Sequence, residues 1–267
     1  MEGEQPGSVG GVPPEHRPGD LAAAGFADGR RYHDARPDYP QRAVDFLVDE
    51  LGLGPASHVV DLGAGTGIFT AQVLPRCGRV TAVEPAEAMR RELARNLPGV
   101  DVLAGRDTAI PLADATADAV TVAQAFHWFD APRALVEIHR VLVPGGGLGL
   151  LWNEIDESVP WVAAYSVAMR WPTCQPYRVG TDFTPVLAAG PFRDVRRRAF
   201  GHVQVLDHAG LLRRAESVSY VSVMAEQERR ALLADVARVV RALPEPVALP
   251  YVTVAYRATA AGMVGGG

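Results

Sequence analysis

The sequence predicts an α/β protein built on a doubly wound parallel sheet. Between residues 57 and 152, short apolar runs alternate with segments of helical periodicity, a pattern typical of βαβ units. A glycine-rich turn follows the first apolar run and precedes a helical pattern, as at the ligand-binding edge of such sheets. The 267 residues, 48% of them hydrophobic, suffice for one large domain with a buried core.

The N-terminal segments differ sharply in composition. Residues 1–25 are rich in Pro and Gly and are expected to form a disordered tail, because they hold too little apolar surface to offset the entropy of ordering. Residues 26–56 are expected to be helical. Their main helix is predicted to begin near Gln41, directly after Pro40, and to end near Gly52.

The central segment, residues 57–152, is predicted to be the ligand-binding core. Strands are expected at 58–62, 80–84, 100–104, 119–123 and 148–152, with helices beginning near Phe69, Glu87 and Pro132. Right-handed crossovers stack such strands in parallel, so their carboxyl ends meet at one edge. We therefore expect the ligand at that edge.

After Trp152 the alternation stops. Residues 153–190 carry aromatic side chains among prolines and are expected to form a helical insertion, a substrate lid over the carboxyl edge of the sheet. Residues 191–260 are expected to complete the sheet, with strands at 192–205 and 247–258 and helical stretches around 209–215 and 226–243.

Composition excludes several classes of function. The 26 basic and 31 acidic residues give a net charge of −5, which argues against nucleic acid or an anionic membrane as partner. Every basic residue is Arg, so P-loop, Schiff-base and pyridoxal-phosphate chemistry lack their lysine. A Lys-free chain rich in Ala, Arg, Gly and Pro is typical of a high-GC genome such as that of an actinobacterium.

The cysteines and the hydropathy pattern indicate a cytoplasmic protein without a metal. Cys77 and Cys174 stand far apart and show no metal-ligand spacing, so we expect two free thiols and no zinc site. The chain shows no signal-peptide pattern and no apolar run approaching the roughly 18 residues of a membrane span. The oligomeric state is left open.

The strongest local motif is VVDLGAGTG, at residues 59–67. Its glycines follow a GxGxG spacing, and Ile68 stands where the third glycine of a dinucleotide-binding loop would be. Asp61 would repel a pyrophosphate but attract a ligand with an ammonium and a sulfonium group. Glu84 ends the second strand 84 − 63 = 21 residues after Gly63, the approximate spacing of an acid that binds ribose hydroxyls. The alternative is a tight turn without a ligand.

Four segments together carry a family resemblance. DLGAGTG, AVEPAEAM, IPLADATADAVTVAQAFHWFD and EIHRVLVPGGGLGLLWNE resemble class I S-adenosylmethionine-dependent methyltransferases of type 11, and more closely the small-molecule branch that includes trans-aconitate-type methyltransferases. The resemblance is strong over residues 26–161. It implies a Rossmann-like sheet of seven strands, one of them antiparallel, S-adenosylmethionine as cofactor and an N-terminal cover over the cofactor.

The resemblance also implies cofactor-binding residues. These are Asp61, Gly63, Ala64, Gly65 and Gly67 around the methionine part, Glu84 at the ribose, Pro85, Met89 and Asp107 near the adenine, Gln124 and Ala125 after the fourth strand, and Tyr32 and Arg36 in the cover. One position departs from the family pattern. Gly105 is followed by Arg106, and the acid that reaches the adenine comes one position later, as Asp107.

Candidates for catalysis and substrate binding follow the fourth strand and the fifth. His127 is a candidate general base, because its reference pKa of about 6.5 suits proton transfer near neutral pH; the alternative is a packed histidine that orients its neighbours. The candidate substrate-binding residues are Trp128, Trp152, Trp161 and Tyr165. The helical spacing of Trp161 and Tyr165 is equally typical of a core-facing helix.

The sequence thus predicts an S-adenosylmethionine-dependent methyltransferase that acts on a small molecule, in the setting of natural-product biosynthesis. Three alternatives stay open. They are a protein of the same fold that catalyses another reaction such as a cyclisation, an NAD-dependent oxidoreductase, and a non-catalytic binding protein.

Overall fold

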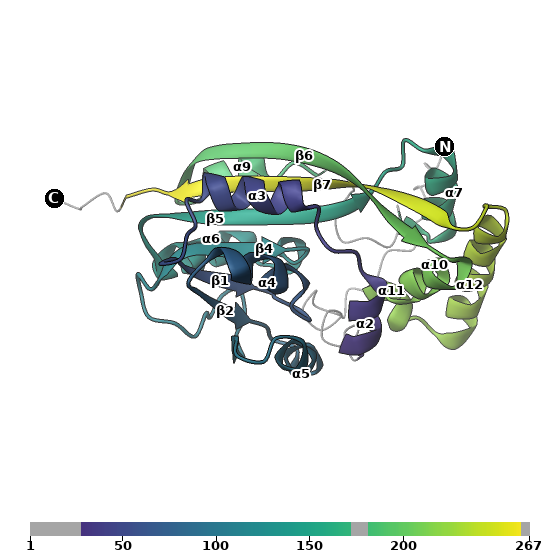
Figure 1. The fold of residues 1–267 in the computed structure, drawn as a ribbon, viewed down its shortest axis with the longest axis horizontal. Coiled ribbons are helices and arrows are strands. Elements are labelled where there is room, and N and C mark those ends of the chain that lie inside the picture. Colours follow the sequence, from purple (N-terminus) through teal and green to yellow (C-terminus); the bar gives the residue numbers. More distant parts are fainter. Residues whose placement is uncertain (1–27, 172–180, 263–267) are drawn as a thin grey trace, which may run out of the picture.

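The structure, a computed structural model, describes residues 28–171 and 181–262. Its strands are β1 (His58–Leu62), β2 (Arg79–Val83), β3 (Asp101–Leu103), β4 (Ala117–Ala123), β5 (Leu142–Ile155), β6 (Phe192–Leu206) and β7 (Val247–Ala260). They form one sheet in the order β3-β2-β1-β4-β5-β7-β6 (Figure 1). Strands β1 to β5 pair in parallel, and β7 is antiparallel to both β5 and β6. The seven-stranded sheet with one antiparallel strand is confirmed.

The helices join and cover these strands. They are α2 (Gly29–Ala35), α3 (Gln41–Glu50), α4 (Ile68–Val73), α5 (Glu87–Asn96), α6 (Ala131–Val141), α7 (Pro160–Ala168), α9 (Thr184–Ala189), α10 (His208–Glu216), α11 (Ser219–Ser222) and α12 (Glu226–Arg241), with 3-10 turns η1 (Leu74–Arg76) and η2 (Phe126–Trp128). The expected tail at 1–25 and Cys174 lie outside the described residues. Cys77 is a free thiol, as expected.

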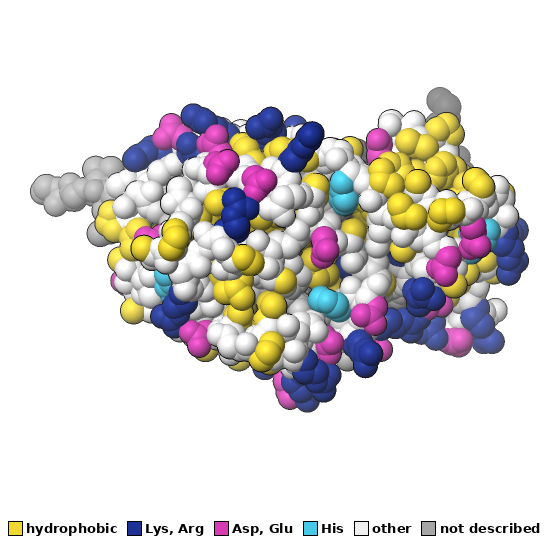
Figure 2. Space-filling view, in the orientation of Figure 1, with side chains coloured by type: hydrophobic (Ala, Val, Ile, Leu, Met, Phe, Trp, Pro, Cys, Tyr) yellow, Lys and Arg dark blue, Asp and Glu magenta, His cyan; other side chains and the backbone are white. Residues whose placement is uncertain are grey.

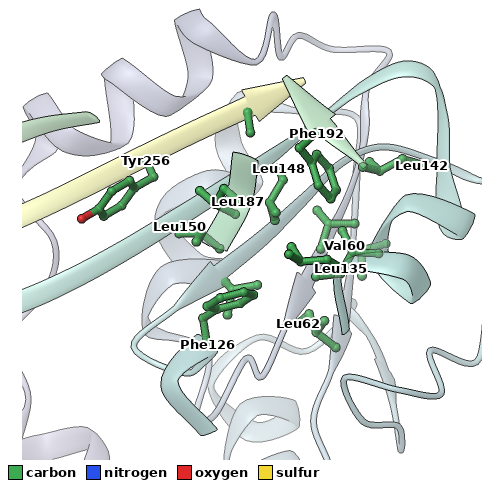
Figure 3. Close-up of a cluster of buried hydrophobic side chains, with 14 of the residues drawn as sticks. Val60, Leu62, Phe126, Leu135, Leu142, Leu148, Leu150, Leu187, Phe192 and Tyr256 are labelled. Atoms are coloured by element: carbon green, nitrogen blue, oxygen red, sulfur yellow. The ribbon is translucent and has the colours of Figure 1, made fainter. Parts of the chain in front are cut away.

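Apolar side chains cover both faces of the sheet, which explains why the central strands read as continuous hydrophobic runs. On one face, Leu47 of α3 and Phe69 of α4 pack against β1. On the other face, Leu135 of α6 and Leu187 of α9 pack with Leu148, Phe126 and their neighbours (Figure 3). Buried on both sides, the sheet holds the carboxyl ends of β1, β2 and β4 in fixed positions.

A second apolar cluster lies where β5, β6 and β7 run beyond the central sheet (Figure 1). It joins α7, α10, α11 and α12 to the ends of β6 and β7 through side chains such as Tyr165, Leu211, Val236 and Tyr251, each at most 2% exposed. We call these four helices the helical group. Helix α2 contacts both α5 of the central sheet region and α10 of the helical group.

Two predictions about the region after residue 141 need correction. The fifth strand is much longer than 148–152, because the Pro-Gly-rich start of β5 pairs with β4 through a register shift, while its end pairs with β7 through Ile155. Residues 153–155 are therefore strand rather than helical insertion. Beyond them, α7 is helical, as expected for residues 153–190, and it packs together with α10, α11 and α12 in the helical group.

The surface of the described residues carries charges of both signs (Figure 2). No helix in the described ranges is long and apolar enough to cross a membrane. On the face shown in Figure 2, acidic and basic side chains are interspersed, and apolar side chains gather near α7, where Val167 is 70% exposed.

Candidate active site

The glycine-rich loop between β1 and α4 adopts a backbone that only glycine tolerates well. Gly63, Gly65 and Gly67 have φ of +72°, +57° and +88°. A Cβ at Gly63 would lie 2.6 Å from the Ala125 Cβ, and one at Gly67 would lie 3.0 Å from Leu93 Cγ. A Cβ at Gly65 would meet nothing within 4 Å. Gly63 and Gly67 thus allow close packing of the protein, whereas Gly65 borders open space that suits a ligand.

Asp61 lies fully buried beside this loop. Its carboxylate accepts hydrogen bonds from Thr70 Oγ1 at 2.6 Å and from Thr121 Oγ1 at 3.3 Å. Burial raises the pKa of Asp61 to about 6, and the charge of Glu84 adds to the rise. A buried acid held only by neutral hydroxyls is poised for a cationic ligand.

Glu84 stands directly after β2 and is 6% exposed. One carboxylate oxygen accepts from the Gly65 N–H at 2.9 Å and the other from the Ala86 N–H at 2.8 Å. Burial raises the pKa of Glu84. The hydrogen bond to Gly65 shows that the acid and the glycine loop, 19 residues apart, form one site.

The residues expected near the adenine do not all line open space. Met89 of α5 is 1% exposed, whereas Pro85 is exposed. Asp107, after β3, accepts from the Asp130 N–H at 3.0 Å. Asp107 therefore ties the end of β3 to the start of α6, a structural contact that its sequence position did not reveal.

The end of β4 reaches the site through a strained backbone. Gln124 has φ of +57°, uncommon for a residue with a side chain, and its Nε2 donates to the Asn153 carbonyl at 2.8 Å. Ala125, the next residue, faces the glycine loop at Gly63. The strain places Gln124 in the wall of a cavity that also contains Asn153.

His127 lies in η2 against the core. Its Nδ1 accepts a hydrogen bond from Trp152 Nε1 at 3.2 Å, so the proton resides on Nε2. Burial lowers the pKa of His127 to about 3. An imidazole of such low basicity is a poor proton acceptor, so the structure favours an orienting role over the expected general base.

The N-terminal segment bridges the glycine loop and the helical group. His33 Nδ1 is 2.9 Å from Thr66 Oγ1 in the loop, and Arg31 forms an ion pair with Glu216 of α10. The Arg36 guanidinium stacks over the Tyr32 ring at 4.8 Å. Tyr32 and Arg36 line the same cavity as Gln124.

The four candidate substrate-binding residues lie mostly in packed interiors. Trp152 is 1% exposed and stacks on Phe183 at 4.3 Å between ring centroids. Trp161 and Tyr165 both lie on α7 in the helical group, where Trp161 is partly buried and Tyr165 is fully buried. Trp128 is half-buried beside His127. None of the four lines the cavity at Gln124.

Some residues that line this cavity were not among the site residues predicted from the sequence. Ile68, Asn153, Arg214 and Tyr251 line it together with residues of the N-terminal segment. Arg214 and Tyr251 lie far along the chain, on α10 and β7, in segments that carry no motif. Only the extension of β5, β6 and β7 toward the helical group brings them to the site.

Comparisons with known proteins agree with this geometry. The methyltransferase domain family matches residues 60–150, which span β1 to β5. An uncharacterized methyltransferase of Mycobacterium tuberculosis is 38% identical over 239 residues, covering 86% of this chain and 93% of that protein. The chain is a class I S-adenosylmethionine-dependent methyltransferase.

Solved structures share the fold of this methyltransferase. A structure from Anaeromyxobacter dehalogenans named as a type II methyltransferase aligns with a TM-score of 0.64 at 24% identity, covering 85% of this chain and 97% of that one. A cyclase aligns with a TM-score of 0.54 at 18% identity, covering 85% and 84%. Identities this low show a common fold.

The described residues fit S-adenosylmethionine. Asp61 and Glu84 are buried acids whose hydrogen bonds go to neutral groups, and open space borders Gly65 between them. A ligand that carries an ammonium, a sulfonium and ribose hydroxyls supplies the charge and the donors that these acids lack. Both acids are the ones that the sequence predicted for this cofactor.

Replacing Gly65 by Val is predicted to lower the affinity for S-adenosylhomocysteine more than about tenfold, because the side chain fills the open space beside Glu84. The control is Gly145→Val, at an exposed irregularity of β5, where φ is +81° and a Cβ also meets nothing within 4 Å. Both variants pay a similar backbone strain of about 1–2 kcal/mol. Calorimetric titration alongside thermal unfolding checks this; equal affinities would refute our placement of the cofactor.

Replacing Asp61 by Asn is predicted to stabilise the ligand-free protein at pH 7.5 by up to about 3 kcal/mol. The folded-state pKa of about 6 lies above the unfolded value, so the wild type loses stability as pH rises from about 4 to 6. The difference in the free energy of unfolding between the variant and the wild type should vanish toward pH 4. Urea unfolding between pH 4 and 8 measures this difference, with Asp49→Asn at an exposed position as the control. An Asp61→Asn variant that is less stable than the wild type at pH 7.5 would contradict the argument.

Replacing His127 by Ala is predicted to destabilise the protein by about 1–3 kcal/mol, because the buried Trp152 N–H loses its acceptor. His127→Asn restores a side-chain acceptor and should recover part of the stability, and turnover with it. Rescue by Asn identifies a positioning residue. If Asn restores stability but turnover stays as low as in His127→Ala, the imidazole is needed as a base.

Proposed function

We propose that this methyltransferase transfers the methyl group of S-adenosylmethionine to a small molecule bound in the cavity beside Gln124. The observation that carries the proposal is the position of this cavity. It lies between the carboxyl ends of β4 and β5, the start of α4 at Ile68 and the N-terminal segment at Tyr39, with a volume of about 30 Å³. The N-terminal segment covers this space, and a covered site suits a small acceptor better than a polymer that needs an open groove. The volume is that of about one or two waters, so an acceptor fits only once the N-terminal segment moves.

The chain's own residues account for binding and orientation. Asp61 and Glu84 hold the cofactor from beneath the loop, and Gly65 lets it approach the backbone. The cofactor, when bound, supplies an electrophilic methyl group on a sulfonium that becomes a neutral thioether after in-line displacement. Gln124, anchored on Asn153, forms the wall against which the acceptor aligns. Proximity and exclusion of water supply the acceleration.

The N-terminal segment must move for ligands to enter. Its contacts to the loop at Thr66 and to α10 at Glu216 hold it across the site. We propose that Tyr32 and Arg36 close over the cofactor once it has bound, so that the reaction proceeds in a desolvated space. The biological setting that we propose is natural-product biosynthesis, which rests on the Lys-free composition.

The proposal is tested by titrating the protein calorimetrically with S-adenosylmethionine, S-adenosylhomocysteine and NAD, then screening small acceptors for S-adenosylhomocysteine formation. We expect binding of the first two ligands, no binding of NAD, and turnover with at least one acceptor. NAD binding alone would support an oxidoreductase. Chemical conversion of an acceptor without S-adenosylhomocysteine release would support a cyclisation-type reaction of the same fold.

A further inference from the structure

Two arginines from outside the glycine loop line the active-site cavity. Arg214 comes from α10 and is 2% exposed, and Arg36 comes from the segment after α2. Both line the cavity that Gln124 and Ile68 border. Arg214 Nη1 and Arg36 Nε are buried and have no hydrogen-bond partner.

The partners that these guanidinium groups do have are neutral. Arg214 Nε donates to the Tyr251 hydroxyl at 3.0 Å, and its guanidinium lies 5.6 Å from the centre of the Trp171 ring. Arg36 Nη2 donates to the Ser217 carbonyl at 3.2 Å. Within residues 28–171 and 181–262, neither arginine forms an ion pair with a carboxylate, although fifteen other ion pairs between arginine and a carboxylate occur there.

Two like charges in one buried place are costly to the ligand-free fold. Burial and the neighbouring Arg214 both lower the pKa of Arg36, whereas at Arg214 the effect of burial is outweighed by Tyr251 and Tyr165, which raise its pKa. A buried cation is normally paired, because desolvation is repaid only by a counter-ion with good geometry. The missing counter-ion is therefore expected from a ligand.

Tyrosine hydroxyls complete the surroundings. Tyr165 has a buried hydroxyl without a hydrogen-bond partner, and it interacts electrostatically with Arg36 and Arg214. Tyr251 donates to Gln204 at 3.0 Å while accepting from Arg214, which fixes the direction of the guanidinium. Guanidinium N–H groups that lack a hydrogen-bond partner and lie beside a hydroxyl are suited to bind an oxyanion, because arginine binds carboxylate and phosphate through two parallel hydrogen bonds.

Two ligands could supply an oxyanion to this place: the cofactor, through its amino-acid carboxylate, or the acceptor, through an anionic group. Arg214 and Tyr251 belong to α10 and β7, not to the glycine loop or its neighbouring strands. They form the cavity wall across from Gln124, where the acceptor lies under the proposed function. We infer that Arg214 binds an anionic group of the acceptor, so that the substrates of this methyltransferase are carboxylates or phosphates. This inference rests on the proposed function.

The matched variants for the test are Arg214→Met and Arg213→Met. Arg213 is the neighbouring residue on α10, with a side chain that is 62% exposed and 3.8 Å from Asp207. Without ligand, Arg214→Met should unfold at a temperature equal to or above that of the wild type, because an unpaired buried charge is removed. If Arg214 only stabilises the fold, Arg214→Met should unfold at a lower temperature than the wild type, and that result would overturn the inference.

Binding is measured by calorimetry at saturating S-adenosylhomocysteine, with benzoate, phenyl phosphate and neutral benzamide as probes. In the wild type, at least one of the two anions should bind about tenfold more tightly than benzamide. Arg214→Met should abolish this preference, and Arg213→Met should retain it. Absence of any anion preference in the wild type, or its retention in Arg214→Met, overturns the inference.

A second titration tells whether Arg214 binds the carboxylate of the cofactor or an anionic group of the acceptor. It compares the affinities for S-adenosylhomocysteine and for 5′-methylthioadenosine, which lacks the carboxylate. Arg214→Met should leave both affinities within about twofold of the wild type. If it weakens S-adenosylhomocysteine tenfold but spares 5′-methylthioadenosine, Arg214 binds the cofactor and the inference about the acceptor is wrong. If the wild type binds neither nucleoside, the proposed function itself fails, a result separate from loss of anion preference.

Discussion

Charge buried without a counter-ion at the carboxyl edge of the sheet is the constraint around which this methyltransferase is organised. Asp61 and Glu84 lie beneath the glycine loop, held by hydroxyls and backbone N–H groups, and Arg36 and Arg214 lie across the cavity, held by aromatic rings, a hydroxyl and a carbonyl. The two signs are kept apart instead of neutralising each other. Under our proposals, a ligand of the opposite charge completes each side, and the ligand-free fold bears the cost of the unpaired charges.

The rest of the fold explains how such charges are tolerated. Strands buried on both faces fix the loop after β1 and the acid after β2, and the long β5, β6 and β7 carry the helical group to the same edge. The N-terminal segment then closes the gap by contacting the loop through His33 and α10 through Arg31. The binding of ligands can thus both order the N-terminal segment and offset the desolvation cost of the buried charges.

The sequence predicted the parts of the site that depend on neighbouring residues along the chain. The order of strand, glycine loop, helix, strand and acid specifies Asp61 and Glu84, because each step follows from local periodicity and spacing. It could not predict Arg214, which reaches the cavity through tertiary contacts of α10 and looks like any arginine of an amphipathic helix. It also left His127 ambiguous, since only the burial of the ring and the Trp152 contact reveal its low basicity.

A crystal structure of the chain with S-adenosylhomocysteine tests the central claim most directly. The account predicts the amino group of the ligand beside Asp61, the ribose hydroxyls on Glu84 and the backbone of Gly65 against the ligand, with the Arg214 guanidinium still open toward the acceptor cavity. A ligand bound elsewhere, or one whose carboxylate neutralises Arg214, would contradict it.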